Sequence, residues 1–411
     1  MKRCDHSALT LHCRITCRPK GWSTSTSTTP HARGEDYFEA WLRFRNDMPY
    51  PLMWTMRNGG HWVVTRGANV LQVYADSEHF SVDAFGVPRA AGTQQPLGAL
   101  IKDPPAHSQY RQFLNVGLSP RVVRDNEAAI RARAIALIES FQHRGHCEVV
   151  SDFADVLPLS VFLDLVGLPL TDREMLAEWT AETVRGADVA ARQHAFNALA
   201  DYLAPVLASR RHRDDYTDRG DMLSAIADLE VDGVRISNDE AVGAAIHLCM
   251  AGLDTVASLL VFVLAYLARH AEERQLLLSD PARLQGAATE FTRRFPIVVM
   301  SRRVRQDMEF EGVQLKRDEM VTAATMSYNL DPEIFPDPLR FDPGRRTVQL
   351  ATFGHGIHRC PGAILGRMEL LITLQEWLKR IPDFEIVDET ALHTNGGIVA
   401  SMPALNLRWR V

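Results

Sequence analysis

The sequence contains few cysteines, and none of them forms a pair of the kind that binds zinc or exchanges electrons. Six are present among 411 residues: Cys4, Cys13, Cys17, Cys147, Cys249 and Cys360. Because no two stand in a C-x-x-C spacing, zinc ribbons and thioredoxin-like redox motifs have no support. The last three are scattered singly, which is typical of a protein in a reducing cytoplasm.

The chain also lacks a strong excess of charge of one sign and a nucleotide-binding glycine fingerprint. Its formal net charge is −6, which argues against nucleic acid as the main partner. No Gly-x-Gly-x-x-Gly run opens a strand–turn–helix unit, so a built-in flavin or nicotinamide domain is not indicated. The hydrophobic content of 46% excludes global disorder. A chain of this length can bury a core and still house a cofactor.

Residues 1–34 lack the apolar core of a secretory signal. They combine six Lys or Arg residues with a single acid, Asp5, and a Ser/Thr run at 23–29. A transit peptide, a disordered tail and a start site placed too far upstream all have this composition. We expect a disordered tail over 1–34, one folded domain over 35–411 and a cytoplasmic location.

One segment, residues 241–268, is almost wholly apolar and is long enough to span a bilayer. His247 and Asp254 interrupt it, and a carboxylate at the centre of a membrane helix costs about 2.5–3.5 kcal/mol. The segment therefore predicts a buried helix through the middle of a soluble protein. Ser237 and Glu240 fit a capping box at its start, and a helix from there to His270 would be roughly 50 Å long.

Helical periodicity dominates the rest of the chain. Helices are expected over 128–142, 191–210, 284–295 and 361–380. A hairpin is expected around Asn58-Gly59-Gly60, with short strands over 298–304 and 308–315. Prolines exclude regular structure from 331–343. The predicted fold class is mainly α with small β-sheets, and no linker divides the chain.

The densest chemical signal is the run at 353–362, Phe-Gly-His-Gly-Ile-His-Arg-Cys-Pro-Gly. Cys360 stands just before the last expected helix, where free backbone N–H groups and the positive end of the helix dipole favour a thiolate. Gly354 and Gly356 let the loop turn tightly and bring further N–H groups near the sulfur. The loop therefore suits one anionic sulfur ligand. The alternatives are a buried structural cysteine and a nucleophile with a positioned base.

Three weaker signals accompany this loop. Asp254 and Thr255 lie side by side in the apolar helix. Either Asp254 is held in an ion pair with another residue, or the two residues relay protons into a dry cavity. Glu290 and Arg293 form an i, i+3 pair of a kind that is common on helix surfaces. His107 and Arg111 stand one turn apart and suit a bound carboxylate. None of the three is specific by itself.

Taken together, the four motifs resemble the cytochrome P450 family in their order and spacing. They read His-x-x-x-Arg, (Ala/Gly)-Gly-x-Asp-Thr, Glu-x-x-Arg and Phe-x-x-Gly-x-x-x-Cys-x-Gly, and the resemblance covers residues 36–411. It is closest to the soluble bacterial camphor-hydroxylating enzymes, on the residues at 58–62, 252–255, 352–356 and 381–384. The resemblance implies the cytochrome P450 fold, with haem b between a long distal helix and the helix that follows the cysteine loop.

The same resemblance implies a role for each motif. Cys360 would be the thiolate ligand of the haem iron, and thiolate donation favours O–O cleavage. Asp254 and Thr255 would be catalytic and deliver protons to dioxygen. Glu290 and Arg293 would be structural, tied to the proline-rich coil through Arg345. Haem contacts, including those to the propionates, would come from His107, Arg111, Ala251, Arg302, Phe353 and His358.

The sequence departs from the camphor enzymes around the substrate. No tyrosine stands near Gln94-Gln95-Pro96 to hold the camphor ketone, and Met300 replaces an acid beside a propionate. His247 is either a core histidine or a substrate contact. By position, the pocket would be lined by Leu97, His247, Met250, Val298, Ile398 and Val399. This set predicts a compact hydrophobic substrate such as a terpenoid or norisoprenoid.

Electrons must reach such a haem from another protein. The resemblance implies a 2Fe–2S ferredoxin and its reductase, and Arg111, Arg345, Arg359 and Arg367 would give a basic docking face. We predict a monomeric, ferredoxin-dependent monooxygenase with neither nucleic acid nor membrane as partner. The alternatives are a peroxygenase driven by hydrogen peroxide, whose members typically lack the acid–hydroxyl pair, and a haem-based ligand binder without catalysis.

Overall fold

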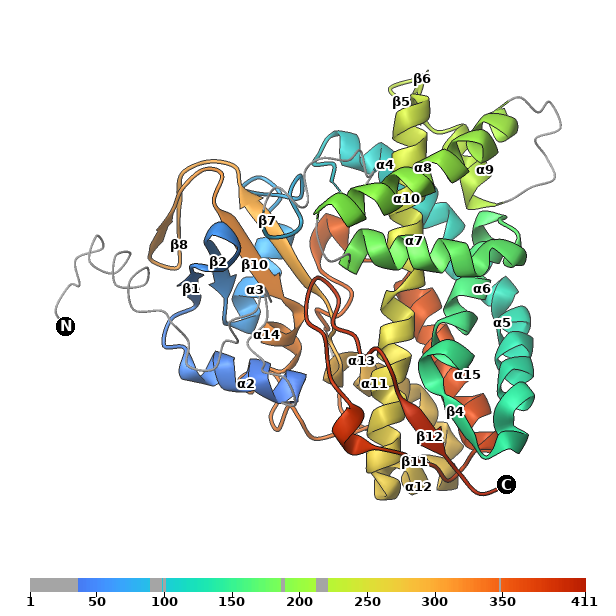
Figure 1. Ribbon diagram of the computed structural model, residues 1–411. Helices are drawn as coiled ribbons and strands as arrows, with labels where there is room; N and C mark the ends of the chain where they lie inside the picture. The colour runs from blue at the N-terminus through green and yellow to red at the C-terminus, as the bar shows by residue number, and fades with distance from the viewer. Residues whose placement is uncertain (1–35, 89–97, 99–100, 186–188, 212–220, 347–348) are drawn as a thin grey trace. The chain divides into compact units, whose positions relative to one another are not determined.

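The computed structural model describes residues 36–88, 98, 101–185, 189–211, 221–346 and 349–411 (Figure 1). The chain groups into two compact units whose segments alternate along the sequence. Unit 1 takes residues up to 94, 290–360 and 393–400, and unit 2 takes 95–289, 361–392 and 401–411. Each unit is described by itself. The tail expected over 1–34 lies outside the described residues.

Unit 1 is built on a five-stranded sheet with the strand order β1-β2-β10-β7-β3. β2 and β10 run parallel, and the other neighbouring pairs are antiparallel. The sheet strands are β1 (Leu52–Thr55), β2 (His61–Val64), β3 (Phe80–Ser81), β7 (Val299–Val304) and β10 (Met320–Ala324). A separate hairpin pairs β8 (Met308–Phe310) with β9 (Val313–Leu315). The helices of this unit are α2 (Tyr37–Asp47), α3 (Gly67–Ala75) and α14 (Thr325–Asn329).

The β1–β2 turn confirms the expected hairpin. Asn58 adopts the left-handed conformation with φ 52°, which asparagine tolerates better than most residues. Gly60 has φ 93°, and a Cβ there would lie 2.5 Å from a ring carbon of Trp54. Glycine is therefore required at Gly60 both by its backbone conformation and by the close approach of the indole.

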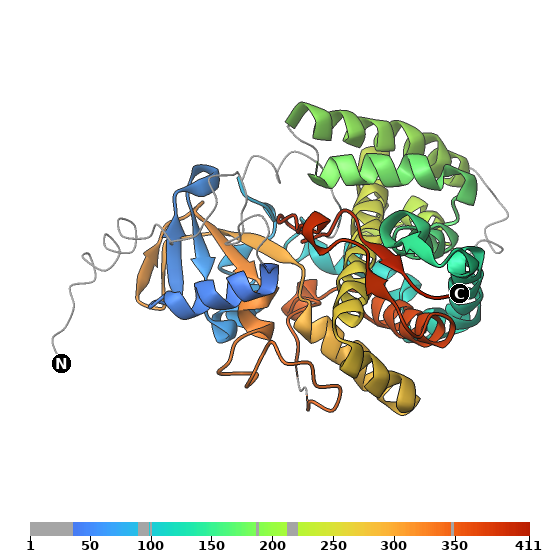
Figure 2. The ribbon, with the colours of Figure 1, turned by 60° about the horizontal axis from the view of Figure 1, so that its bottom comes forward.

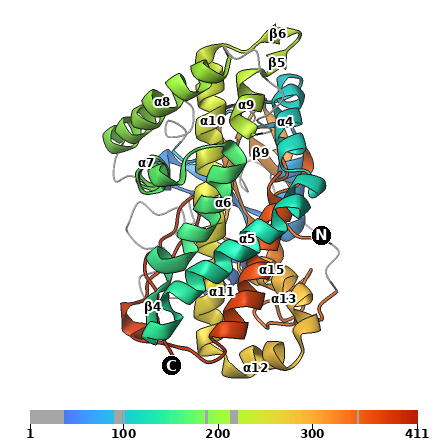
Figure 3. The same ribbon diagram turned by 90° about the vertical axis from the view of Figure 1, so that its right-hand side faces the viewer.

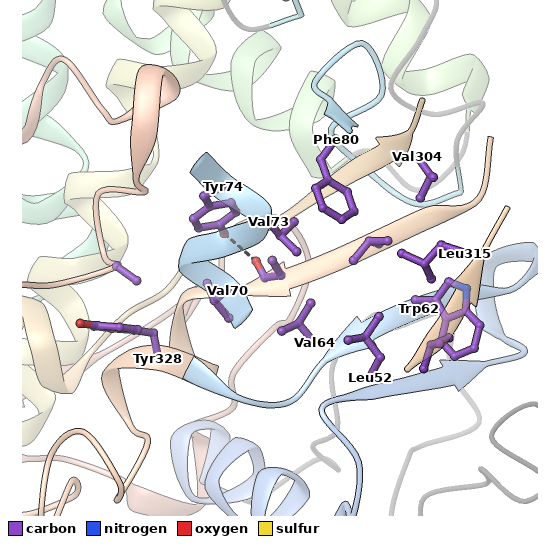
Figure 4. Packing of buried hydrophobic residues seen from close by; sticks show 14 of the residues in the cluster. Leu52, Trp62, Val64, Val70, Val73, Tyr74, Phe80, Val304, Leu315 and Tyr328 are labelled. Atoms are coloured by element: carbon purple, nitrogen blue, oxygen red, sulfur yellow. Dashed lines mark hydrogen bonds between the residues drawn. The ribbon is translucent and has the colours of Figure 1, made fainter. Parts of the chain in front are cut away.

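The core of unit 1 lies between α3 and the sheet (Figure 4). Val70 and Val73 of α3 point toward strand residues such as Val64. The Tyr74 hydroxyl, also buried, donates a hydrogen bond to the Ala323 carbonyl at 2.6 Å. Burying each such apolar side chain contributes about 1.5–3 kcal/mol, and the tyrosine contact fixes how α3 sits on the sheet.

Unit 2 is mainly helical and carries two small sheets, β11-β12-β4 and β5-β6. The strands are β4 (His146–Glu148), β5 (Glu230–Val231), β6 (Val234–Arg235), β11 (Glu385–Ile386) and β12 (Asn406–Arg408). The helices are α4 (Ala106–Gly117), α5 (Pro120–Phe141), α6 (Val156–Val166), α7 (Arg173–Arg185), α8 (Val189–Arg211), α9 (Met222–Ala227), α10 (Asn238–Leu253), α11 (Thr255–Arg269), α12 (Ala271–Ser279) and α15 (Ala363–Arg380). Helices α7 and α8 lie side by side and both pack on α10 (Figure 2).

The expected helices over 128–142, 191–210 and 284–295 are confirmed as α5, α8 and α13 (Leu284–Arg294). Helix α5 begins earlier than expected, at Pro120, because Ser119 caps it and proline suits the first helical position. The division between the two units falls inside α13, at Thr289 and Glu290. The fold class, mainly α with small sheets, is confirmed.

The single long helix expected over 237–270 is two helices, α10 and α11, which follow one another in one column (Figure 3). The capping box is present: Glu240 N–H donates to Ser237 Oγ at 3.2 Å, and Ser237 N–H donates to Glu240 Oε2 at 3.1 Å. The break falls at Asp254. Residues 238–269 have the length and hydropathy of a membrane span, but 71% of the tested window is buried within the protein, as expected for a core helix.

Candidate functional site

Cys360 closes a tight loop in unit 1. Its backbone N–H donates to the Phe353 carbonyl at 2.7 Å, and the Gly354 N–H donates to the Ala351 carbonyl at 2.7 Å. Cys360 is exposed, whereas Cys147 and Cys249 are buried, and burial raises the pKa of Cys249 to about 12. Among the cysteines that the structure describes, Cys360 is therefore the one that can present its sulfur to a ligand.

The loop is positioned by its contact with the end of α3. Gly356 has φ 69°, and a Cβ there would lie 2.8 Å from the Tyr74 carbonyl oxygen and 3.0 Å from the Ala75 Cα. These are backbone atoms, which cannot move aside cheaply. The short 3-10 turn at Gly356–His358 therefore approaches α3 as closely as it does only because residue 356 is glycine.

The helix after the loop begins later than the sequence suggests. We expected Pro361 to open it, but α15 starts at Ala363 with Gly362 in the N-cap position. Residues 361 and 362 form a turn instead. Proline suits a first helical position, but it suits a turn equally well. Cys360 is thus three residues before the first helical residue, Ala363, and not immediately before the helix.

Unit 1 also contains three of the other residues predicted to contact haem. Phe353 and His358 lie on the cysteine loop itself. Arg302 lies on β7, is buried, and its guanidinium carbon is 5.0 Å from the centre of the Tyr74 ring. Because the loop packs on α3 next to Tyr74, these basic groups and the thiol belong to one neighbourhood. The sequence did not indicate Tyr74, because no local pattern predicts that α3 and β7 contact each other.

Three predicted pocket residues of unit 1 also lie together. Val298 forms a β-bridge with Val399, and the Val299 N–H donates to the Ile398 carbonyl at 2.8 Å. Val298 and Ile398 are half-buried, while Val399 is buried. The structure therefore brings together side chains that are about 100 residues apart in sequence. Leu97, and the segment Gln94-Gln95-Pro96, lie outside the described residues.

In unit 2, an accessible stripe runs along the C-terminal half of α10 and onto the first residue of α11. Ala251 is exposed, and His247, Met250 and Thr255 are half-buried, at helical spacings of one and two turns. The residues next to His247 in the chain are buried: Ala245, Ile246, Leu248 and Cys249. The stripe is the surface of α10 that a bound molecule can reach.

The predicted acid–hydroxyl pair lies at the end of this stripe. Asp254 is 7% exposed and has φ −108° and ψ −32° between the two helices. The Thr255 hydroxyl donates to the Ala251 carbonyl at 3.2 Å, a bond back along the helix of the kind that bends it. A Cβ on Gly252 would lie 2.4 Å from a Phe162 ring carbon, so α6 holds the helix at the break. The structure therefore sets a carboxyl and a hydroxyl beside an interruption in a buried helix.

His107 and Arg111 lie one turn apart on α4, as expected. His107 is buried, and its pKa is lowered by burial and by the nearby positive charge of Arg111, with Asp103 acting in the opposite direction. Arg111 is half-buried and its Nε donates to Asn115 Oδ1 at 3.0 Å. A neutral imidazole that donates a hydrogen bond and a guanidinium together suit a carboxylate group of a ligand.

Glu290, Arg293 and Arg345 form one buried cluster in unit 1. Arg293 donates two hydrogen bonds of 2.8 Å to the Glu290 carboxylate and others to the carbonyls of Asn329 and Pro338. Arg345 donates to Glu290 at 3.1 Å and to the Pro336 carbonyl at 2.8 Å. The pair thus holds the proline-rich coil against α13, because it satisfies backbone groups that the coil cannot pair with itself.

The residues present fit a haem group. The iron of a porphyrin needs one ligand atom from the protein. Among the described residues, no cluster of three or more His, Cys, Asp or Glu is able to hold a metal. One exposed cysteine, Cys360, can provide the single ligand atom. The anionic propionates of the porphyrin suit the basic groups Arg302, His358, His107 and Arg111. Its flat face suits Ala251, a small side chain left accessible in the last turn of α10.

Comparison with known proteins gives the same family. The family model described as "Cytochrome P450" matches residues 284–394. A "Probable cytochrome P450 127A1" of Sinorhizobium fredii is 36% identical over 351 residues, covering 85% of this chain and 84% of that protein. The chain belongs to the cytochrome P450 family. It is therefore a haem-dependent monooxygenase with haem b as its cofactor, and its substrates include dioxygen.

Two further relatives of this cytochrome P450 show how widely the similarity extends. The solved structure of CYP101J2 has a TM-score of 0.85 and 35% sequence identity, covering 97% of this chain and 100% of that one. A "Cyclomarin C epoxidase" of Salinispora arenicola is 32% identical and covers 85% of this chain and 90% of that protein. The fold is thus shared over nearly the whole length of the relatives.

Proposed function

We propose that this cytochrome P450 hydroxylates a compact hydrophobic substrate, such as a terpenoid or norisoprenoid, in the cytoplasm and as a monomer. Its electrons come from a 2Fe–2S ferredoxin and a ferredoxin reductase. The observation that carries the proposal is that the chain contains two features: in unit 1, the loop with the exposed Cys360, and in unit 2, an acid and a hydroxyl at the break between α10 and α11. A haem-binding protein without catalysis has no need of that second feature.

Cys360 provides the sulfur ligand of the haem, and Arg302, His358, His107 and Arg111 bind its carboxylates. When bound, haem with a thiolate ligand supplies the activation of dioxygen and favours O–O cleavage. The loop hydrogen bond from Cys360 N–H to Phe353 fixes the backbone that carries the sulfur. Phe353 and Ala251 would give the bound group apolar contact and exclude water from it.

Asp254 and Thr255 hold and move the protons that the reaction consumes. The Thr255 hydroxyl donates a hydrogen bond to the Ala251 carbonyl, so the lone pairs of the hydroxyl oxygen remain available to accept one. Asp254, the neighbouring carboxyl, is the group that can exchange a proton with the protein interior. Asp254 is buried and Thr255 is half-buried, so the two adjacent groups lie between the interior of unit 2 and its accessible surface.

The proposed substrate class follows from the side chains that the sequence assigns to the substrate pocket. Met250, Val298, Ile398 and Val399 are apolar, and the accessible stripe of α10 is only about two turns long. A small apolar site selects substrates by shape and holds one C–H bond near the reacting oxygen. The relatives carry names with different substrates, cyclomarin C for one and a steroid for another, so a shared fold does not fix the substrate.

The proposal is tested by spectroscopy and by turnover. The reduced protein with carbon monoxide should absorb far to the red of a histidine-ligated haem, and Cys360→Ala should abolish that band. Product formation should be supported by ferredoxin, reductase and reduced nicotinamide. If hydrogen peroxide alone supports faster turnover than the ferredoxin system, the peroxygenase alternative holds. If the band survives in Cys360→Ala, the ligand assignment is wrong.

A further inference from the structure

His247 is a polar side chain on the accessible stripe of α10 whose presence the proposed chemistry does not explain. Burial lowers the pKa of His247 to about 4, and the positive charge of Arg111 acts in the same direction. The imidazole is therefore neutral at physiological pH and carries one donor and one acceptor nitrogen. Within the part of the chain that the structure describes, no group makes a hydrogen bond with it.

His247 keeps accessible surface on α10 where its neighbours in the chain do not. The flanking residues Ile246 and Leu248 are buried, whereas His247 keeps accessible surface although it lies deep enough to lose its charge. One turn earlier the stripe ends, because Gly98 packs against Ala244 so closely that an added Cβ would lie 3.1 Å from the Ala244 Cβ. A deep polar group with accessible surface and no protein partner is a place where a ligand or an ordered water bonds.

The spacing along α10 sets the size of the molecule that reaches both ends of the stripe. His247 precedes Ala251 by one turn of α10, a rise of about 6 Å, and Thr255, the first residue of α11, follows beyond the break at Asp254. A compact molecule lying over Ala251 thus has one end at the acid–hydroxyl pair and the other at His247. Its oxidised C–H bond belongs at the first end, and a polar group belongs at the second.

We propose that His247 is a specificity-determining residue whose imidazole hydrogen-bonds a carbonyl or hydroxyl oxygen of the substrate, at the end remote from the C–H bond that is oxidised. The inference rests on the proposed function and narrows its substrate class to compact oxygen-bearing molecules. An all-hydrocarbon ligand leaves the imidazole unpaired in a dry site, so the same residue selects against it.

The test compares two rigid cages of nearly equal size, 2-adamantanone and adamantane. Their dissociation constants are measured from the spin-state change of the haem-replete full-length protein, and the quantity read out is the ratio between the two ligands. In His247→Leu, this ratio should shift by about tenfold against the ketone, with adamantane binding unchanged or tighter. His247→Gln, which keeps a hydrogen-bonding group, should restore part of the ketone preference. Met250→Leu, an apolar exchange in the same stripe, should move both ligands together.

The two proposals fail in different ways. A wild-type protein without the thiolate-type carbon monoxide band contradicts the proposed function, whatever His247 does. A wild-type protein with that band whose ketone-to-hydrocarbon ratio equals that of His247→Leu overturns the role of His247 alone. If His247→Leu does not retain haem, His247→Phe provides a ring of similar shape without a hydrogen-bonding atom, and its ratio decides in the same way.

Discussion

At the scale of single residues, the hydrogen bond of Thr255 leads to a direct prediction about catalysis. Its hydroxyl donates to the Ala251 carbonyl, so the side chain is held in place without any substrate. Thr255→Ala removes the hydroxyl oxygen but leaves the apolar stripe of α10 intact. Substrate binding, measured by the spin-state change, should stay within about twofold, while product formed per electron pair should fall by about tenfold or more.

The matched control for Thr255→Ala is Thr255→Ser, which keeps a hydroxyl at the same point. It should retain most of the coupling, and hydrogen peroxide should accumulate in the Ala variant only. Coupling that is equal in the wild type and in Thr255→Ala would remove Thr255 from the proton path.

Glu369 is a second residue whose behaviour follows from burial. It lies on α15, is 2% exposed, and burial raises its pKa to about 8. The folded state therefore holds a proton that the unfolded state releases between pH 4.5 and 8, so the free energy of unfolding falls as pH rises through this window. Glu369→Gln keeps the shape without the charge and should raise the free energy of unfolding at pH 8 by about 1–3 kcal/mol, measured by urea denaturation.

Glu376, two turns along the same helix, gives a control of opposite sign. Burial alone would raise its pKa, but hydrogen bonds from Arg131 and Arg380 at 2.7 and 2.6 Å outweigh it and lower the pKa. Its ionised form stabilises the fold above pH 4.5, so Glu376→Gln should lower the free energy of unfolding at pH 8. Equal effects of the two substitutions would contradict the pKa assignment for Glu369.

The sequence does not distinguish these two glutamates. They lie seven residues apart in one helical pattern, and each has arginine or lysine nearby. A charged side chain in such a helix is normally solvated. Their difference comes from what packs against each face of α15, which only the tertiary structure specifies. The same holds for His247, where the sequence left a core histidine and a substrate contact equally open.

At the scale of elements, the cysteine loop depends on how closely it approaches α3. Gly356→Ala would place a Cβ 2.8 Å from the Tyr74 carbonyl oxygen at φ 69°. The left-handed backbone costs about 1–2 kcal/mol, and the clash adds about 1–3 kcal/mol. We expect loss of haem affinity and a lower midpoint of thermal unfolding, both followed in the Soret band.

Gly354→Ala is the matched control for this prediction. Gly354 also has a positive φ, 72°, but the nearest atoms to an added Cβ are 3.8 Å away. It should therefore show the backbone cost without the clash. A Gly354→Ala variant that loses haem as readily as Gly356→Ala would show that the approach to α3 is not what holds the loop.

The sequence predicts elements well where local rules decide them. The capping box at Ser237 and Glu240, the Asn58-Gly59-Gly60 hairpin and helix α13 all follow from short-range chemistry and are confirmed. Helix boundaries at special sites were wrong in two places, the break at Asp254 and the start of α15 at Ala363. At Asp254 the cause is packing of α6 against the break, and before α15 it is the turn at Pro361. The spacing of apolar residues does not predict either one.

At the scale of the whole molecule, the segments of the two units alternate along the chain. Two of the boundaries between units fall inside α13 and directly after Cys360, at places that composition alone does not mark. The parallel pairing of β2 with β10 joins Trp62 to Val321, across most of the chain. Such pairings have no periodic signature, so the sequence predicts the strands but not the sheet order.

The distribution of charge over the molecule also revises the expected docking face. Arg345 is not available to a partner protein, since its guanidinium is bound to Glu290 and to the carbonyls of Pro336, Asp337 and Arg340. Arg367 is half-buried, whereas Arg359 is exposed on the cysteine loop. With a formal net charge of −6, the molecule as a whole repels an acidic ferredoxin. Under the proposed function, attraction to an acidic ferredoxin must therefore come from local charge near the loop.

This charge arrangement predicts that electron transfer from an acidic 2Fe–2S ferredoxin is steered mainly by Arg359 and weakens with salt. Screening acts over about 10 Å at 0.1 M ionic strength, so the ferredoxin-dependent rate should fall steadily between low and moderate salt. Arg359→Glu should lower the low-salt rate by about tenfold and flatten the salt dependence. Arg121→Glu on α5, an 87% exposed side chain, makes the same change in net charge and should alter the rate little. Equal losses in the two variants would mean that net charge, and not a local contact at the cysteine loop, governs the encounter. Peroxide-supported turnover, which needs no ferredoxin, should be the same in both and so separates docking from damage to the haem site.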